Sequence, residues 1–306
     1  MTRATKISFV GFGEAAMAFV KGWRQAAAID ASFPVGAYDI KSGAPDPAVA
    51  AAKQRDYAAC DVAGADSPGA ALQDADLVFS LVTADQAATA ARTAALHLAS
   101  GSLFLDCNSC APGTKRHSAE VIEAAGGRYV DVAVMSPVYP KMHETPLLVS
   151  GPHSAAALAA LAPLKMKAQI FEGDIGAASS VKMIRSIMVK GMEALFAECV
   201  LAGRKAGVDE TVLASFDVTY PGFHFPFRAA YNFERMMQHG RRRAEEMREV
   251  ALTVEELGLP SEMSRATVSW QQRIGDLQME AGEDNYQSRA DALLARIHAN
   301  EMKLEK

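Results

Sequence analysis

The chain has 306 residues, half of them hydrophobic and 22% charged, a composition that supplies a large core and argues against global disorder. A chain of this size is expected to form about two domains. Its net charge of −5, without a long basic block early in the chain, argues against nucleic acid as a partner. No apolar run approaches the ~20 residues of a membrane span, so no membrane partner is expected. A predicted strand begins by residue 6, which leaves no room for a signal peptide, and we expect a cytoplasmic protein.

The first predicted strand, residues 6–10, leads directly into Gly-Phe-Gly-Glu-Ala-Ala at 11–16, and an Ala-rich helical stretch follows at 17–28. Strand, Gly-x-Gly-x-x-Ala and helix form the order in which a backbone cradles a pyrophosphate. Gly11 permits the tight turn, Gly13 leaves room for the phosphates, and the helix N-terminus favours an anion. The alternative is a purely structural turn. The cofactor-binding residues predicted here are Gly11, Phe12, Gly13, Glu14 and Ala15.

The second predicted strand, residues 33–38, ends at Asp39. An acidic residue at this position bonds the adenosine ribose hydroxyls of NAD and repels the 2′-phosphate of NADP. Asp39 lies somewhat farther along the chain than the ~20 residues of the usual fingerprint, a difference that the linking helix and loop can absorb. Lys41 nearby leaves tolerance for NADP, and a capping or turn aspartate is the alternative interpretation.

Further apolar runs predict strands at 76–82, 102–106, 128–134 and 147–151. Because they alternate with helical stretches, they indicate βαβ units and a parallel sheet. We therefore expect an α/β, doubly wound sheet of the Rossmann type, whose ligand binds beyond the carboxyl ends of the strands. The residues predicted around that cleft, besides the glycine turn, are Asp39, Val82, Thr83, Asn108, Ser109 and Ser136.

The four cysteines are Cys60, Cys107, Cys110 and Cys199, of which the second and third form a C-x-x-C spacing. A metal or redox site would call for a second pair or for histidines at zinc spacing, and neither is present in the sequence. We expect reduced thiols beside a functional loop, and no metal site.

The pattern changes after Gly173. No proline occurs from 176 to 206, and apolar residues recur every three or four positions, which predicts one long helix. The remaining sequence is helical in pattern, with a break at 220–227. We place the boundary here, between an NAD(P)-binding α/β domain at 1–173 and an all-α domain for substrate binding and dimerisation at 174–306.

A polar stripe is predicted on the long helix. Lys182, Ser186, Lys190 and Glu193 are spaced so that they share one helical face, set among apolar neighbours. A lysine two turns into a helix that leaves the cofactor domain is a candidate acid/base. The alternative is a solvated face with i,i+4 pairing.

Four stretches in order resemble the β-hydroxyacid dehydrogenase superfamily, which includes 6-phosphogluconate and 3-hydroxyisobutyrate dehydrogenases. The turn at 11–16 is similar to the family's cofactor turn, and residues 106–112 resemble its Asp-x-Ser-Thr-x-x-Pro segment. Residues 131–137 occupy the place of its Asp-Ala-Pro-Val-Ser-Gly-Gly substrate loop. Residues 173–182 resemble its Gly-x-x-Gly…Lys segment, and this resemblance implies that Lys182 is the catalytic lysine.

The departures from the family bear on the substrate. Ser186 stands where the family usually has Asn four residues after the lysine. In the substrate loop, Met135, Ser136 and Pro137 replace Ser-Gly-Gly, so a hydroxyl and one N–H donor are lost. Weaker carboxylate binding by this loop admits a bulkier or less acidic substrate. The late Lys-Asp pair of the family aligns near 245–246, where two glutamates stand, so the chain resembles a branch with its own C-terminal helical domain.

The segment His-Gly-Arg-Arg-Arg at 239–243 has two interpretations. It is either a basic patch that holds an anionic substrate, with His239 as a contact, or a solvated turn that pairs with the glutamates at 245–246.

The resemblance implies an NAD(P)-dependent oxidoreductase that moves a hydride between the nicotinamide and the carbinol carbon of a 3-hydroxy acid or related secondary alcohol. Lys182 is the predicted general acid/base. The predicted substrate-binding residues are Ser109, Ser136, Ser186 and His239. NAD is the expected cofactor, with NADP tolerated. The resemblance implies a dimer or a tetramer, and we predict a homodimer.

Two alternatives remain open. One is a catalytically silent NAD(P)-binding sensor or interaction protein, which the altered substrate loop favours. The other is an imine reductase on the same fold, although relatives with that activity commonly replace the lysine that stands here at Lys182.

Overall fold

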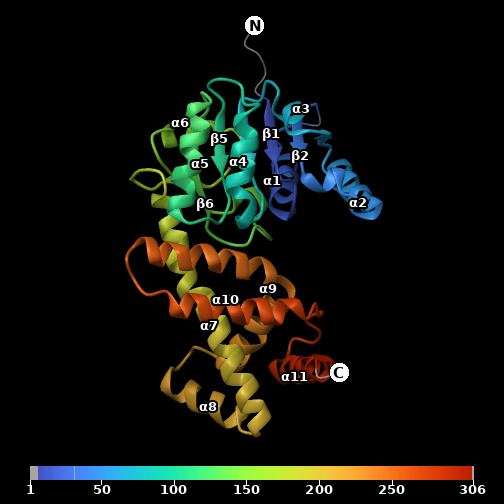
Figure 1. Cartoon of the computed structure of the whole chain (residues 1–306), viewed down its shortest axis with the longest axis vertical. Helices are drawn as coiled ribbons and strands as arrows, with labels where there is room; N and C mark the ends of the chain where they lie inside the picture. The colour runs from blue at the N-terminus through green and yellow to red at the C-terminus, as the bar shows by residue number, and fades with distance from the viewer. Residues whose placement is uncertain (1–5, 31, 305–306) are drawn as a thin grey trace. The chain divides into compact units, whose positions relative to one another are not determined.

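The structure is a computed structural model that describes residues 6–30 and 32–304, with side chains described as far as residue 299. The chain divides into two compact units, residues 1–183 and residues 184–306 (Figure 1). The division falls within helix α7 (Ala177–Ala206), whereas the sequence pattern places the boundary at residue 173. The difference arises because the first turns of this helix bond to the sheet of the first unit.

The first unit contains an eight-stranded sheet in the order β3-β2-β1-β4-β5-β6-β7-β8. The first six strands in this order run parallel, so the predicted Rossmann-type sheet is confirmed. Chain order reverses between β1 and β4, and this is the switch point where such sheets bind their ligands. The strands are β1 (Ile7–Val10), β2 (Val35–Tyr38), β3 (Ala63–Gly64), β4 (Leu77–Ser80), β5 (Leu103–Asp106), β6 (Arg128–Val134), β7 (Leu147–Ser150) and β8 (Ala168–Ile170).

Strand β7 is the exception to the parallel pattern. It runs antiparallel to β6, with Asp131 opposite Ser150 and Val134 opposite Leu147. The connection at 135–146 holds only the short 3₁₀ turn η3 (Met142–Glu144). A parallel crossover usually carries an α-helix, and this connection has none, so the two strands form a hairpin.

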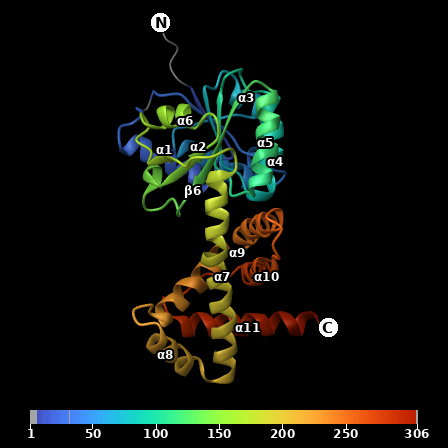
Figure 2. The ribbon, with the colours of Figure 1, turned by 90° about the vertical axis from the view of Figure 1, so that its left-hand side faces the viewer.

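Helices cover both faces of the sheet, as Figure 2 shows, with α1 and α6 on one side and α4 and α5 on the other. The first face buries a cluster that includes Phe9, Trp23 and Phe79, and the second buries Phe104 and Tyr129. Because both faces of the sheet are covered, the residues on both sides of the strands are mostly apolar, and the strands are nearly continuous hydrophobic runs in the sequence. The helices of this unit are α1 (Glu14–Gln25), η1 (Ile40–Gly43), α2 (Pro47–Ala58), α3 (Pro68–Leu72), η2 (Ala84–Gln86), α4 (Ala87–Ala95), α5 (Pro112–Ala124) and α6 (Ser154–Leu161).

All the secondary structure in the described residues of the second unit is helical. The predicted break at 220–227 falls between α8 and α9 in its first part, because α9 already begins at Phe225. Helices α9 and α10 pack along each other, and they approach most closely at two glycines. A methyl group at Gly240 would stand 2.5 Å from the carbonyl oxygen of Gln271, and one at Gly275 would overlap the backbone nitrogen of Arg241. Besides the continuation of α7, the helices are α8 (Asp209–Thr219), α9 (Phe225–Glu256), α10 (Glu262–Asp276) and α11 (Tyr286–Leu304).

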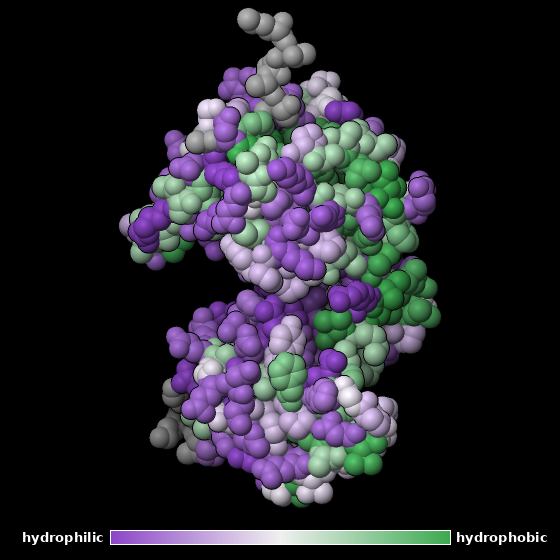
Figure 3. Space-filling model, turned by 180° about the vertical axis from the view of Figure 1, so that it is seen from behind, coloured by the Kyte–Doolittle hydropathy of each residue, from purple (hydrophilic) through white to green (hydrophobic). Residues whose placement is uncertain are grey.

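Three of the four residues of the polar stripe of α7 are buried in the second unit. Ser186, Lys190 and Glu193 are 5%, 5% and 2% exposed, so the solvated-face alternative is wrong for these three. Figure 3 shows hydrophobic patches between hydrophilic side chains on the face that it views. Three large apolar side chains of the same helix are exposed. They are Ile184, Met188 and Leu195, at 50%, 65% and 55% exposure. The homodimer stays a prediction, with which these exposed side chains are consistent.

Among residues 6–30 and 32–304, no helix is both long enough and apolar enough to cross a bilayer.

The glycine contact between α9 and α10 predicts a large effect of one added methyl group. Gly275→Ala should lower the free energy of unfolding by about 1–3 kcal/mol, because the two backbones must separate. Gly191→Ala on α7 is the matched control: its added carbon would lie 3.9 Å from the nearest heavy atom, the Thr267 hydroxyl oxygen. The control should gain about 0.5–1 kcal/mol from helix propensity. Urea unfolding followed by circular dichroism measures both, and equal stability of the two variants would contradict the close contact.

Candidate active site

The glycine turn follows β1 at the switch point. Gly11 has φ +83°, and a side chain there would place its first carbon 2.5 Å from the carbonyl oxygen of Leu81. Its N–H donates to the Tyr38 carbonyl at 2.8 Å. Only glycine combines this backbone conformation with so close an approach. The turn is therefore fixed between the ends of β1, β2 and β4.

Gly13 and the start of α1 provide the space and the donors that a pyrophosphate needs. A carbon added at Gly13 would meet nothing within 4 Å. Helix α1 begins at Glu14, and no side-chain hydrogen bond caps it among the described residues. Its first N–H groups and its dipole thus face the open space above the turn. Ala16 is fully buried, so the helix packs closely on the sheet. These residues fit the diphosphate of a dinucleotide.

Asp39 follows β2 beside this turn. Its Oδ2 accepts from the Phe12 N–H at 2.8 Å and its Oδ1 from the Lys41 N–H at 2.9 Å. Lys53 donates to the Phe12 carbonyl at 2.5 Å, and its Nζ lies 3.9 Å from Asp39 Oδ2. Asp39 thus caps η1 as a turn aspartate. Each carboxylate oxygen keeps a second lone pair, so this capping leaves acceptors for a ribose hydroxyl.

Asn108 joins the ends of β4 and β5. Its Oδ1 accepts from the Val82 N–H at 2.7 Å, and its amide nitrogen donates to Ser80 Oγ at 2.9 Å and to Asp106 Oδ1 at 2.8 Å. The residue is 3% exposed. Its side chain therefore shapes the predicted cofactor edge from beneath. Val82 is partly exposed and Thr83 is exposed at the same edge.

The predicted substrate residues of the first unit follow β5 and β6. Ser109 is partly exposed directly after Asn108. Ser136 donates to the Pro137 carbonyl at 3.2 Å. The Met135 N–H donates to the Pro146 carbonyl at 2.9 Å within the hairpin. Both serines lie in loops at the carboxyl ends of parallel strands, on the edge that also carries the glycine turn and Asp39.

Lys182 lies in the second turn of α7, partly buried, in the first unit. Burial raises the pKa of the Cys107 thiol to about 12, whereas the charges of Lys115 and Lys182 act to lower it. One turn earlier on the same helix, Ser179 bonds to Asp131, so the start of α7 lies against strand β6.

A buried polar network lies beneath this edge, and the sequence analysis missed it as a unit. We call it the Asp131 network, and every member is at most 2% exposed. Its members are Asp106, Lys115, Tyr129, Asp131, Ser150 and Ser179. Burial would lower the pKa of Lys115, but Asp106 and Asp131 raise it above its usual value, so its side chain is charged. The available signal was a charged residue inside an otherwise apolar predicted strand, which must find a partner.

In the second unit, the polar stripe of α7 bonds to α9 and α10. Lys190 donates to Ser186 Oγ at 3.1 Å and pairs with Glu246 at 2.9 Å. Glu193 pairs with Arg243 and accepts from the Gln271 amide at 2.6 Å. Ser186 is thus placed inside a buried ionic cluster of this unit.

His239 lies partly buried on α9 and is not a cation at neutral pH. Burial, with the positive charges of Arg235, Arg242 and Arg243, lowers its pKa to about 4. Arg242 pairs with Glu246 at 2.8 Å along the helix. This ion pair favours helix pairing over a basic patch as the interpretation of residues 239–243.

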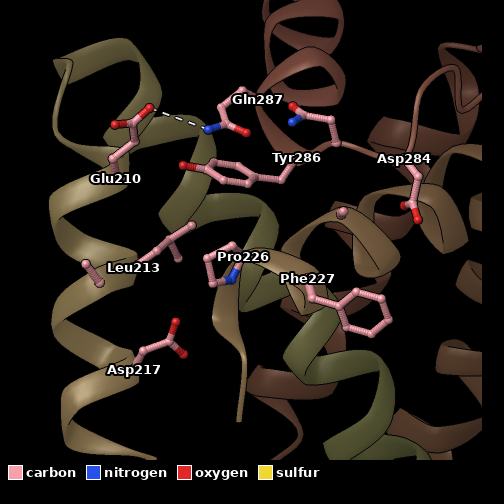
Figure 4. Close-up of a pocket in the computed structure, with 11 residues that line it drawn as sticks. Glu210, Leu213, Asp217, Pro226, Phe227, Asp284, Tyr286 and Gln287 are labelled. Atoms are coloured by element: carbon pink, nitrogen blue, oxygen red, sulfur yellow. Dashed lines mark hydrogen bonds between the residues drawn. The ribbon is translucent and has the colours of Figure 1, made fainter. Parts of the chain in front are cut away.

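A surface hollow of about 430 Å³ in the second unit carries none of the predicted site residues (Figure 4). Across it, Glu210 accepts from the Gln287 amide at 3.5 Å. Asp217 accepts from the Phe225 N–H at 2.9 Å, and Asp284 pairs with Arg289 at 3.0 Å. Because each acidic side chain already has a partner, we do not include this hollow in the candidate site.

All four cysteines are free thiols. Cys107 and Cys110 are buried, and a thiol with the raised pKa of Cys107 is not a reactive nucleophile. In the part of the chain that the structure describes, no three His, Cys, Asp or Glu side chains are grouped to hold a metal ion.

A doubly wound sheet with a glycine turn and an uncapped helix N-terminus at its switch point defines an NAD(P)-binding domain. The family model described as the NAD binding domain of 6-phosphogluconate dehydrogenase matches residues 6–171, and a domain of unknown function, DUF1932, matches residues 204–274. The chain belongs to the β-hydroxyacid dehydrogenase superfamily, with a helical C-terminal region.

Solved structures agree with this assignment. A conserved hypothetical protein from Sinorhizobium meliloti 1021 is 35% identical, with a TM-score of 0.71 over 96% of this chain and 97% of that one. The conserved protein MTH1747, of unknown function and described as structurally similar to 3-hydroxyacid dehydrogenases, is 26% identical, with a TM-score of 0.64 over 89% and 97% of the two chains. Mycobacterium tuberculosis 3-hydroxyisobutyrate dehydrogenase shares the fold at 17% identity, with a TM-score of 0.68 over 95% and 99%.

The lowered pKa of His239 predicts a specific loss of stability in acid. An unfolded chain protonates this imidazole near pH ~6.5, whereas the folded protein does so only near about 4. The free energy of unfolding should therefore fall as the pH drops through this window, and His239→Gln should flatten that part of the profile. Urea unfolding across the pH series and an NMR titration of the imidazole measure this. A titration midpoint near ~6.5 would contradict the buried, cationic surroundings.

Proposed function

We propose that this protein is an NAD(P)-dependent oxidoreductase acting on the carbinol carbon of a 3-hydroxy acid or related secondary alcohol, with Lys182 as general acid/base. The observation that supports it is the position of Lys182 on α7. It lies partly buried in the second turn of this helix, three residues after Ser179, whose N–H and hydroxyl bond to Asp131 in β6. The carboxyl ends of the strands also carry the glycine turn, which leaves open space at Gly13 and leads into a helix without a side-chain cap.

We assign a separate role to each group of residues at this edge of the sheet. Bound nicotinamide supplies the hydride acceptor. Lys182, neutral at that moment, takes the proton of the substrate hydroxyl at Nζ, and in the reverse direction its ammonium returns the proton. Ser109 and Ser136 orient the hydroxyl and any acid group. Phe12 to Ala15 and Asp39 hold the cofactor, while Asn108 keeps the β4 and β5 loops in place.

The substrate loop supports a weakly acidic or bulkier substrate. Pro137 has no N–H, and the Met135 N–H is engaged within the β6–β7 hairpin. The backbone of this loop therefore supplies few donors for a carboxylate. This feature also favours the second candidate function, an NAD(P)-binding protein without catalysis, and the same assay separates the two.

Lys182→Ala should lower kcat by roughly 10²–10⁴-fold while the affinity for NADH stays nearly unchanged, because the amine moves a proton and does not hold the cofactor. Lys182→Arg should be equally slow, since a guanidinium keeps its proton. The measurement is absorbance at 340 nm with NAD and NADP separately, against aliphatic and aromatic 3-hydroxy acids.

Lys205→Ala, an exposed lysine near the other end of α7, is the control and should keep full activity. Near-normal turnover of Lys182→Ala would remove this lysine from the mechanism. NADH binding by the unchanged protein, with no turnover of any compound in the panel, would favour the non-catalytic candidate.

The carboxylate of Asp39 should set the cofactor preference for NAD. Asp39→Asn keeps an acceptor for the Phe12 N–H but removes the charge that repels a 2′-phosphate, so the ratio of NADP to NAD affinity should rise roughly ten-fold or more. Fluorescence titration with NADH and NADPH measures it. Asp46→Asn is the control, an exposed helix-capping aspartate that accepts from the Ala48 N–H at 2.8 Å. An unchanged ratio in Asp39→Asn would show that the ribose lies elsewhere.

A further inference from the structure

Asp131 lies within β6 and is completely buried, yet it bonds mainly to the beginning of a helix. Its Oδ2 accepts from the N–H groups of Gly176 and Ser179 at 3.1 and 3.0 Å, and from Ser150 Oγ at 3.1 Å. Its Oδ1 accepts from Ser179 Oγ at 2.5 Å. Ser150 Oγ in turn accepts from the Ala178 N–H at 3.0 Å. The first N–H groups of α7 therefore end on side chains from β6 and β7.

The charges of the network make this contact necessary. Asp106 and Asp131 are two buried carboxylates, and Lys115 is the single ammonium between them, 3.0 Å from the first and 3.5 Å from the second. Asp106 also accepts from the Tyr129 hydroxyl at 2.7 Å. Asp131 has the longer contact with the ammonium, so its remaining charge is balanced by the positive end of the α7 dipole. A buried carboxylate without such a partner is strongly unfavourable.

This contact fixes where α7 begins and which way it is turned. Ser179 gives Asp131 both its N–H and its hydroxyl, which sets the axial position and the rotation of the first turn. Lys182 follows three residues later, about 4.5 Å along the axis and on nearly the same face. Its amine and the Asp131 carboxylate both act on the Cys107 thiol, as expected for groups held in one neighbourhood.

We infer that Asp131 and Ser179 are positioning residues that hold the Lys182 amine at the cofactor edge. Neither residue is exposed to a ligand, so they act through the helix and not on the substrate. The inference rests on the acid/base role proposed above for Lys182.

Ser179→Ala tests this with little risk to folding, because the Ser179 N–H still reaches Asp131 and every buried charge keeps its partner. Ser118→Ala is the matched control: Ser118 lies on α5, is 1% exposed, and its hydroxyl has no hydrogen-bond partner among the described residues. We expect kcat of Ser179→Ala to fall about ten-fold or more, since small displacements of a catalytic group are costly. KM should change little, and NADH affinity and Ser118→Ala should match the unchanged protein.

A second measurement needs no substrate. Reductive methylation with ¹³C-formaldehyde labels lysine amines, and the Lys182 signal is identified by its absence in Lys182→Ala. In Ser179→Ala this signal should move toward the chemical shift of exposed lysines, and in Ser118→Ala it should stay in place. An unmoved signal with unchanged kcat in Ser179→Ala would overturn the positioning role even if Lys182→Ala is inactive. A moved signal with an active Lys182→Ala would instead overturn the proposed acid/base role.

Discussion

The structure of the first unit depends on how two buried carboxylates are balanced. Asp106 is the last residue of β5, and Asp131 lies within the neighbouring parallel strand β6. One lysine, Lys115, stands between the two carboxylates. Because one ammonium cannot neutralise two carboxylates, the start of α7 is drawn to the sheet, where its N–H groups bond to Asp131. This explains why the compact first unit extends to Met183 and includes the first turns of the long helix. The same requirement explains why charged residues persist in strands that are otherwise apolar.

The signals for the predicted cofactor edge are short and local in the sequence. The glycine turn, the helix after it and Asp39 lie close in sequence to the strands that position them, and turn chemistry at Gly11 depends on its own backbone conformation. Strand positions followed from apolar runs for the same reason. The antiparallel direction of β7 was not predicted, since it depends on whether the connection before it carries a crossover helix. The Asp131 network escaped prediction because Asp106, Asp131 and Ser179 are far apart in sequence, and only the folded sheet brings them together.

In the second unit, the sequence pattern located the long helix but did not show which of its faces is buried. Periodicity located the long helix and its two faces, but it assigned the polar stripe of α7 to solvent or to catalysis with equal ease. In the structure Lys190 and Glu193 pair with α9, and the apolar residues Ile184 and Met188 are exposed. A helical period reports which residues share a face and says nothing about which face is buried. Buried ion pairs fix one arrangement of helices at little net gain in stability, so their value here is specificity of packing.

The altered loop after β6 limits what kind of substrate the proposed chemistry can serve. A loop of Ser-Gly-Gly type presents a hydroxyl and backbone N–H groups to a carboxylate, whereas here Met135 directs its N–H into the hairpin and Pro137 has none. In the proposed site, an acid group of the substrate would meet the hydroxyls of Ser109 and Ser136, which are neutral donors, each weaker than a charged one. A substrate that gains its affinity from apolar contact suits such a loop better than a small dianion. A cofactor turn of the family's type beside a different substrate loop is thus the arrangement expected if the proposed redox reaction acts on a different alcohol.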